Sequence, residues 1–121
     1  MAKTINISAA LSIAGDGATL AGSKQVAAIT QVGNASFAAV QTVGFASGEA
    51  VSLGDISGEC AIYFQNTDST NFVMVHTADS WSAPVIKLKA GEAAVIFTTG
   101  TTWYAKADTA AVDLLVVACE R

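Results

Sequence analysis

Charged residues are scarce in this sequence, making up 13% of its 121 residues, about half the share usual in soluble proteins. Disordered chains combine low hydrophobicity with high charge, so a chain that is 52% hydrophobic is expected to fold. A small monomer normally spreads charged side chains over its surface. We therefore expect part of this protein's surface to be covered by other subunits in its working state.

Basic residues are few as well. The six Lys and Arg residues are scattered along the chain and outnumbered by ten Asp and Glu, which gives a net charge of −4. Direct binding to nucleic acid requires clustered Lys and Arg to neutralise phosphates. The sequence therefore predicts no nucleic-acid partner.

Histidine and cysteine, the residues of many catalytic and metal sites, are almost absent. His76 is the only histidine, so a metal site with two histidines is excluded. Any Cys-His dyad would have to pair His76 with Cys60 or Cys119. The two cysteines lie far apart in apolar runs, which is typical of free buried thiols rather than of a disulfide framework.

The acidic residues lie in or beside segments with turn composition. Asp and Glu at such positions more often accept hydrogen bonds from backbone N–H groups than act as acids or bases. Residues 66–71 (NTDSTN) are rich in oxygen atoms but lack the spacing of an EF-hand calcium loop. We predict a protein that is not an enzyme, with no catalytic residues, no metal and no cofactor.

Long hydrophobic runs are also missing. No stretch approaches the ~18 uninterrupted apolar residues of a membrane helix, and the first residues lack the pattern of a secretory signal peptide. We expect a protein that is made in a cytoplasm and has no membrane partner.

Alternating apolar and polar residues are the main feature that is present. In residues 4–13, the apolar side chains Ile5, Ile7, Leu11 and Ile13 recur at every second or fourth position. A period of two predicts a half-buried strand. Glycines at 15 and 17 then interrupt the pattern, and residues 18–24 are expected to form a turn or an ordered arm.

This first segment has two interpretations, which the sequence leaves open. Residues 1–24 are either an arm with a Gly-rich hinge that adds a strand edge to a partner, or the first strand of the domain's own sheet. In both cases residues 25–121 form the sandwich domain, and the chain is a single domain overall.

Further short strands follow at spacings near ten residues, with turn residues between them. They are expected at 25–32, 36–45, 50–53, 59–66, 72–77, 85–89, 93–99, 102–107 and 112–119. Eight to ten such strands predict an all-β fold, an antiparallel β-sandwich or a jelly-roll-like single domain. Residues 93–97 and 114–117 are apolar on both strand faces, so we expect the N-terminal arm or, preferably, a neighbouring subunit to cover them.

Aromatic residues supply the remaining candidates. Tyr63, Trp81, Trp103 and Tyr104 would suit a sugar-stacking platform on a sandwich. Large aromatic side chains serve equally well as anchors of a protein interface. The residues that we predict at interfaces are Ile5, Ile7, Trp81, Trp103 and Tyr104.

Three segments in the second half resemble a known group of proteins. They are residues 61–75 (AIYFQNTDSTNFVMV), 86–96 (IKLKAGEAAVI) and 102–114 (TWYAKADTAAVDL). This pattern resembles small virion structural proteins of tailed bacteriophages, over roughly residues 58–121. The motifs are structural turns, and the first half of the chain is only loosely similar.

The resemblance implies a β-sandwich carried on a virus particle. The function that it favours is a capsid decoration (cement) protein on the capsid surface, which contacts the major capsid protein or other virion proteins. It also favours a homo-oligomer, a trimer first and a dimer second. The alternatives are a structural component of the tail, neck or fibre, and a carbohydrate-binding receptor module.

Overall fold

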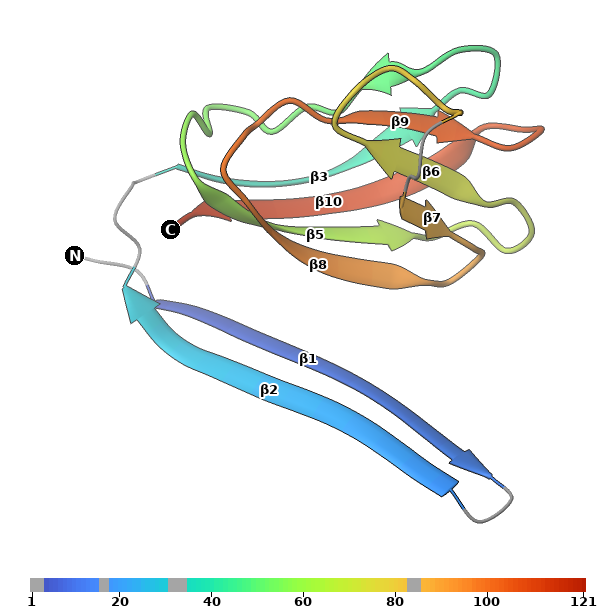
Figure 1. The fold of residues 1–121 in the computed structure, drawn as a ribbon. Coiled ribbons are helices and arrows are strands. Elements are labelled where there is room, and N and C mark those ends of the chain that lie inside the picture. Colours follow the sequence, from blue (N-terminus) through green and yellow to red (C-terminus); the bar gives the residue numbers. More distant parts are fainter. Residues whose placement is uncertain (1–3, 16–17, 31–34, 83–85) are drawn as a thin grey trace.

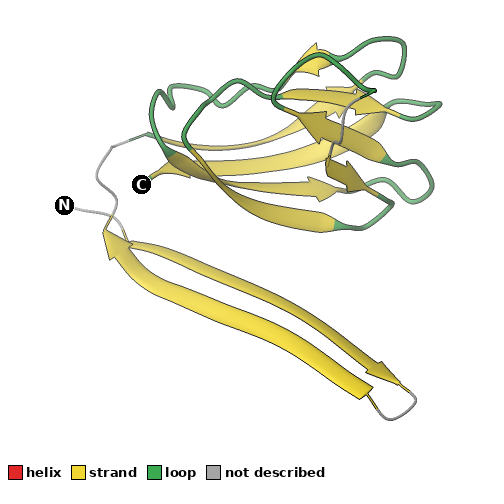
Figure 2. Cartoon of the chain, viewed as in Figure 1, coloured by secondary structure: helices red, strands yellow, loops and turns green. Residues whose placement is uncertain are grey.

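The computed structural model describes residues 4–15, 18–30, 35–82 and 86–121, and the regular structure within them is β-strand throughout (Figure 2). The strands are β1 (Thr4–Gly15), β2 (Ala18–Thr30), β3 (Ser36–Val43), β4 (Glu49–Ala50), β5 (Cys60–Asn66), β6 (Val73–His76), β7 (Ile86–Leu88), β8 (Ala93–Thr98), β9 (Tyr104–Ala107) and β10 (Val112–Glu120).

Strands β3 to β10 form two four-stranded antiparallel sheets, one in the order β3-β10-β5-β8 and the other in the order β4-β9-β6-β7. Counted from β3, the first sheet holds the first, eighth, third and sixth strands, and the second sheet holds the other four. This interleaved order is the connectivity of a jelly roll. The prediction of an all-β, antiparallel, jelly-roll-like sandwich is therefore confirmed.

The core lies between these two sheets and is built by alternation along the strands. In β5, Cys60, Ile62 and Phe64 are fully buried, and they face Val73 and Val75 of β6 across the sandwich. The ring of Phe64 packs against Trp103, with 5.6 Å between the ring centroids. Apolar side chains at every second position thus hold the two layers together.

The N-terminal segment forms a separate two-stranded hairpin, β1–β2, which we call the arm (Figure 1). The register pairs Ile5 with Ile29 and Leu11 with Gly22, with an irregularity between Ile5 and Ile7. Residues 4–13 are therefore not a strand of the sandwich sheets, whereas the addition of a strand edge to a partner stays a prediction.

The arm is longer than the sequence pattern indicated. Residues 18–24, expected as a turn or arm, lie within β2, which continues to Thr30, so the expected division after residue 24 falls inside a strand. β1 pairs with β2 over nearly the whole length of both strands, so the residues at 18–24 have backbone partners. Gly22 lies opposite Leu11 in this register. The expected strand at 25–32 is the second half of β2, and its last two residues lie outside the described residues.

The remaining strands match their expected positions within a few residues, with one exception. The strand expected at 50–53 is reduced to Glu49–Ala50, although the Val51 N–H still donates to the Trp103 carbonyl at 2.8 Å. Val51 and Leu53 instead turn into the core.

Candidate functional site

The sheet β3-β10-β5-β8 has one face in the core and one face outside it. Along β10, Leu114 and Val116 are buried, while Asp113 and Val117 between them are exposed. The same alternation runs through β3, β5 and β8. The outward side chains, which we call the outer face, are Ser36, Ala38, Val40, Thr42, Ala61, Tyr63, Gln65, Ala93, Val95, Phe97, Asp113, Leu115, Val117 and Cys119.

The strand register arranges the outer face in rows. One row runs from Ala38 through Val117 and Tyr63 to Val95, and the next pairs Val40 with Leu115. Several of these side chains are large and exposed: Val40 is 58% exposed, Phe97 48%, Val117 40% and Val95 39%. Neighbouring positions in a sheet form a contiguous patch, and soluble monomers seldom leave a large apolar patch open to water.

Polar side chains on the outer face are few, and four of them pair with each other. Asp113, the one charged residue in the set, lies at one end and accepts a hydrogen bond of 2.7 Å from the Thr42 hydroxyl. Tyr63 donates its hydroxyl proton to Gln65 at 2.8 Å, so these two polar groups satisfy each other. A mainly apolar surface with a few paired polar groups has the composition of a protein interface.

The base of the arm contacts the outer face. Ile5 is 8% exposed, and Ile7 lines, with Tyr63, Val95 and Val117, a groove of about 300 Å³ between the arm and the sheet. Leu11, further along the same strand, is 80% exposed. The predicted interface residues Ile5 and Ile7 therefore lie at a real contact, within the chain itself, whereas Leu11 is uncovered.

The predicted aromatic residues do not gather at one place. Trp103 is 6% exposed and packs in the core, not at the surface where an interface residue was predicted. Tyr63 lies on the outer face of one sheet, whereas Tyr104 lies on the other sheet beside His76, its register partner. Trp81 joins this second group, because its ring meets the His76 ring edge-on at 6.4 Å between centroids.

Trp81 is held in place by its own loop. Its indole N–H donates to Asp79 Oδ1 at 2.9 Å, and its ring lies so close to Gly48 that a Cβ there would approach it to 2.8 Å. These contacts make the side chain half-buried. Trp81, His76 and Tyr104 thus form a small aromatic group on the sheet β4-β9-β6-β7, away from the outer face.

The structure separates the residues that a thiol-dependent catalyst would need. Cys60 is in the core and Cys119 is on the outer face, whereas His76 is on the opposite sheet, so neither cysteine pairs with it. Burial raises the pKa of both thiols, which keeps them protonated. Among the described residues, no three His, Cys, Asp or Glu side chains gather where they would hold a metal ion.

The oxygen-rich segment at 66–71 is a turn that its own side chains hold together. Asp68 Oδ2 accepts backbone N–H groups of Thr70 at 2.9 Å and Asn71 at 2.6 Å. The expectation that acidic residues at turns cap backbone N–H groups is confirmed for Asp68. The Glu92 carboxylate accepts the Lys89 N–H at 2.8 Å in the same way, whereas Asp79 and Asp113 accept hydrogen bonds from side chains.

The Asp68 cap makes the stability of the fold sensitive to acid. The backbone hydrogen bonds from Asn71 and then Thr70 lower the pKa of Asp68. A carboxyl group with a lowered pKa stabilises the fold above its unfolded pKa, about 3.9, and this contribution is lost as the pH falls through the folded value. Asp68→Asn should therefore lower the urea midpoint at pH 7, and the difference from the native chain should shrink as the pH falls below the unfolded pKa of about 3.9.

Urea unfolding at a series of pH values measures this effect. Asp55→Asn serves as the control, because Asp55 is an exposed aspartate on the turn at 54–55. A constant difference between Asp68→Asn and the native chain from pH 7 to pH 2 would show that the charge of Asp68 is not the source of its contribution.

Comparison with known proteins found no match to this chain among family models, curated proteins or solved structures. Within the described residues there is no helix with the length and hydropathy to cross a membrane. What the fold and surfaces define is an all-β, jelly-roll-like sandwich with an apolar outer face and a projecting hairpin arm.

Part of the candidate surface was not visible from the sequence. The β3 contribution, Val40 above all, was missed because the alanines around it obscure the alternation of that strand. The double apolar character of 93–97 and 114–117 was the signal that did identify the rest, since Val95, Phe97 and Val117 are exposed.

Proposed function

We propose that this protein is a non-enzymatic structural protein that assembles through its apolar sheet face, and that it decorates and stabilises the capsid of a tailed phage. The observation that carries the assembly role is the outer face. Its exposed rows around Val40, Val117 and Phe97 continue the surface that already receives Ile5 of the arm. Covering such a surface with protein is more favourable than leaving it in water.

The size of the effect is sufficient for a cement role. At ~25 cal/mol per Å², a standard interface of about 1,600 Å² corresponds to roughly 40 kcal/mol of gross stabilisation if most of the area is apolar. Lost translational freedom and side-chain ordering offset most of this figure. A net gain of a few kcal/mol per contact, repeated over every subunit of a shell, still resists disassembly strongly.

The virus particle enters the proposal through the sequence resemblance. The segments that carry it include the turn at 66–71 and the turn at 90–91, where Gly91 has a φ of +80°. Jelly rolls are common in capsid domains, but they also occur in lectins and other proteins. Fold and motifs therefore support a virion structural role in kind, and an experiment on particles must test it.

That experiment compares phage particles with and without the protein. We expect particles lacking it to lose their DNA at a lower temperature than complete particles do. When the salt concentration is lowered stepwise, they should also lose their DNA earlier, at a higher remaining ionic strength. Adding back the purified chain should restore the stability, whereas adding a Val40→Asp variant should restore less. Equal stability of the two kinds of particle would contradict the decoration role.

The tail, neck or fibre is the second location to consider, with the same assembly chemistry. A cryo-electron microscopy map of the complete particle distinguishes these locations directly. Density for the jelly roll on the capsid surface supports decoration, and density confined to the tail or neck assigns the protein there instead.

The group of Trp81, His76 and Tyr104 favours a sugar-binding module as the alternative function, because aromatic rings stack on sugars. This function is the weaker of the two, since the indole N–H of Trp81 already donates to Asp79. Glycan-array binding that is abolished by Trp81→Ala would support it, and an array without signal would count against it.

A further inference from the structure

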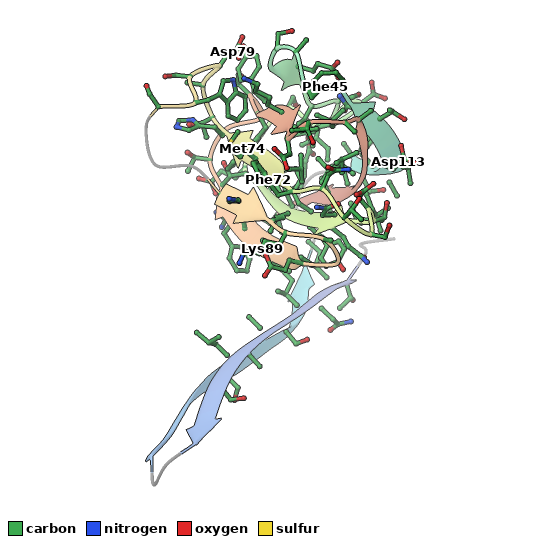
Figure 3. The ribbon with its side chains drawn as sticks, turned by 90° about the vertical axis from the view of Figure 1, so that its right-hand side faces the viewer. Phe45, Phe72, Met74, Asp79, Lys89 and Asp113 are labelled. Atoms are coloured by element: carbon green, nitrogen blue, oxygen red, sulfur yellow. The ribbon has the colours of Figure 1, made fainter. Side chains whose placement is uncertain are left out.

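The arm is a two-stranded element that projects from the sandwich (Figures 1 and 3). A two-stranded hairpin in water is at best marginally stable, and it requires a further strand or a packed apolar face to persist. Among the residues that the structure describes, the arm makes no strand pairing with either sandwich sheet. Its stability must therefore come from a surface that its side chains cover.

The chain's own outer face covers only the base of the arm. β1 has 12 residues and spans about 40 Å, whereas β10, the longest strand of the facing sheet, has 9 residues and spans about 30 Å. Ile5 is 8% exposed, but Leu11 is 80% exposed. The side chain of Leu11, six residues after Ile5 in β1, is therefore not covered by the sandwich.

Even where the arm lies over the sheet, the packing is incomplete. Besides the groove of about 300 Å³ near Ile7, a second space of about 240 Å³ lies between Ala9 of the arm and Tyr63 and Val95 of the sheet. Folded proteins normally fill such spaces to the density of organic crystals. Within one chain, the apolar side chains of the arm and of the outer face therefore leave space between them.

The uncovered part of the outer face begins next to the groove at the base of the arm. Val117 and Cys119 line the groove at the base of the arm, and Leu115 is the next outward residue along β10. Leu115 pairs with Val40, which is 58% exposed. An apolar strip formed by Val40 and Leu115, which ends at Thr42 and Asp113, therefore continues directly from an existing contact with an arm.

Charge also favours the pairing of an arm with a sandwich. The arm, residues 4–30, carries one lysine and one aspartate and so has no net charge, whereas residues 35–121 carry nine acidic and four basic side chains. Two sandwiches therefore repel each other, while an arm without net charge meets no such repulsion from a sandwich. Repulsion between like charges disfavours arrangements in which one sandwich packs on another.

We propose that the far half of the arm, around Leu11, docks on the Val40–Leu115 strip of a second copy of this chain. This inference rests on the proposed assembly function and names its partner. Each copy carries one uncovered arm and one uncovered strip, so two copies can exchange arms about a two-fold axis, or three can close a ring. In either assembly, the arm of each copy covers the Val40–Leu115 strip of a neighbouring copy.

Three variants of the full-length chain test the proposal by sedimentation or light scattering. Leu11→Asp places a charge on the arm and Val40→Asp places one on the strip, and each should raise the dissociation constant at least tenfold. Phe45→Asp is the matched control, because Phe45 is 50% exposed and lies at the side of the sandwich far from the arm (Figure 3). It should change the dissociation constant less than twofold.

A mixture of the two disruptive variants identifies the contact. Leu11→Asp keeps an intact strip and Val40→Asp keeps an intact arm, so an equimolar mixture should form heterodimers through one native contact. Each variant alone should be a monomer at the same concentration. Unchanged far-ultraviolet circular dichroism in all variants shows that folding is preserved, as expected for substitutions at exposed positions.

Three results would overturn the proposal. The first is a native chain that remains a monomer at every concentration. The second is an oligomer that Val40→Asp dissociates but Leu11→Asp does not, which would indicate face-to-face packing without the arm. The third is a chain that associates only with another virion protein, which would remove the second copy as the partner while leaving the proposed structural function intact.

Discussion

Phe64→Ala should lower the free energy of unfolding by about 3–5 kcal/mol, the usual cost of truncating a buried phenylalanine. Phe64 is fully buried in β5 and packs on Trp103 with 5.6 Å between ring centroids. Truncation removes this contact and leaves a cavity between the two sheets, which the rigid strands on both sides cannot close. Since small domains are stable by only about 5–15 kcal/mol, the variant should be close to unfolding at 37 °C.

Urea unfolding at a fixed protein concentration measures this loss, because the stability of an assembling protein depends on concentration. Phe45→Ala is the matched control, since Phe45 is 50% exposed and should change the free energy of unfolding by less than about 0.5 kcal/mol. Equal effects of the two substitutions would mean that the core does not lie between β5 and the opposite sheet.

Asn66→Ala should have the second large effect, a loss of about 3 kcal/mol in the free energy of unfolding. Asn66 is the only fully buried polar residue among those described. Its amide donates to the carbonyls of Asn71 at 2.8 Å and Leu88 at 2.9 Å, and its carbonyl accepts the Asp68 N–H at 2.9 Å. Alanine would leave these backbone groups without partners in a region where water reaches few of them.

Asn71→Ala provides the comparison for this second prediction. Asn71 lies in the same turn, but its side chain is half-buried and bonds to Thr70, Thr109 and Asp68 near the surface. We expect Asn71→Ala to lower the free energy of unfolding by less than about 1 kcal/mol. If both asparagine variants had similar stability, the buried hydrogen bonds of Asn66 would not be what joins β5 to β7.

The sandwich was predictable because its strands follow local rules. Alternation in β5 and β10 and the turn residues around Asp68 and Gly91 act over a few residues, so they appear directly in the sequence. The pairing of β10 between β3 and β5 joins segments about 50 to 80 residues apart, and no local pattern encodes it. The sandwich could therefore be predicted from the sequence, whereas the order of the strands within each sheet could be determined only from the structure.

The candidate surface was predictable only in part, for a related reason. A strand that is apolar on both faces indicates that its outward face is covered, and β8 and β10 have this pattern. The sequence does not show which faces adjoin, so Val40 was missed and Trp103, an aromatic residue that packs inward, was assigned to an interface. Burial of Trp103 depends on a partner, Phe64, nearly 40 residues earlier in the chain.

The solution mass of the native chain, measured by light scattering over a range of concentrations, tests most directly whether neighbouring copies cover the outer face. One chain has a mass of 12.3 kDa. We predict a mass at least twice that value, which falls towards the single-chain value on dilution or with Val40→Asp. A mass of one chain at every concentration, with the protein remaining soluble, would contradict the account.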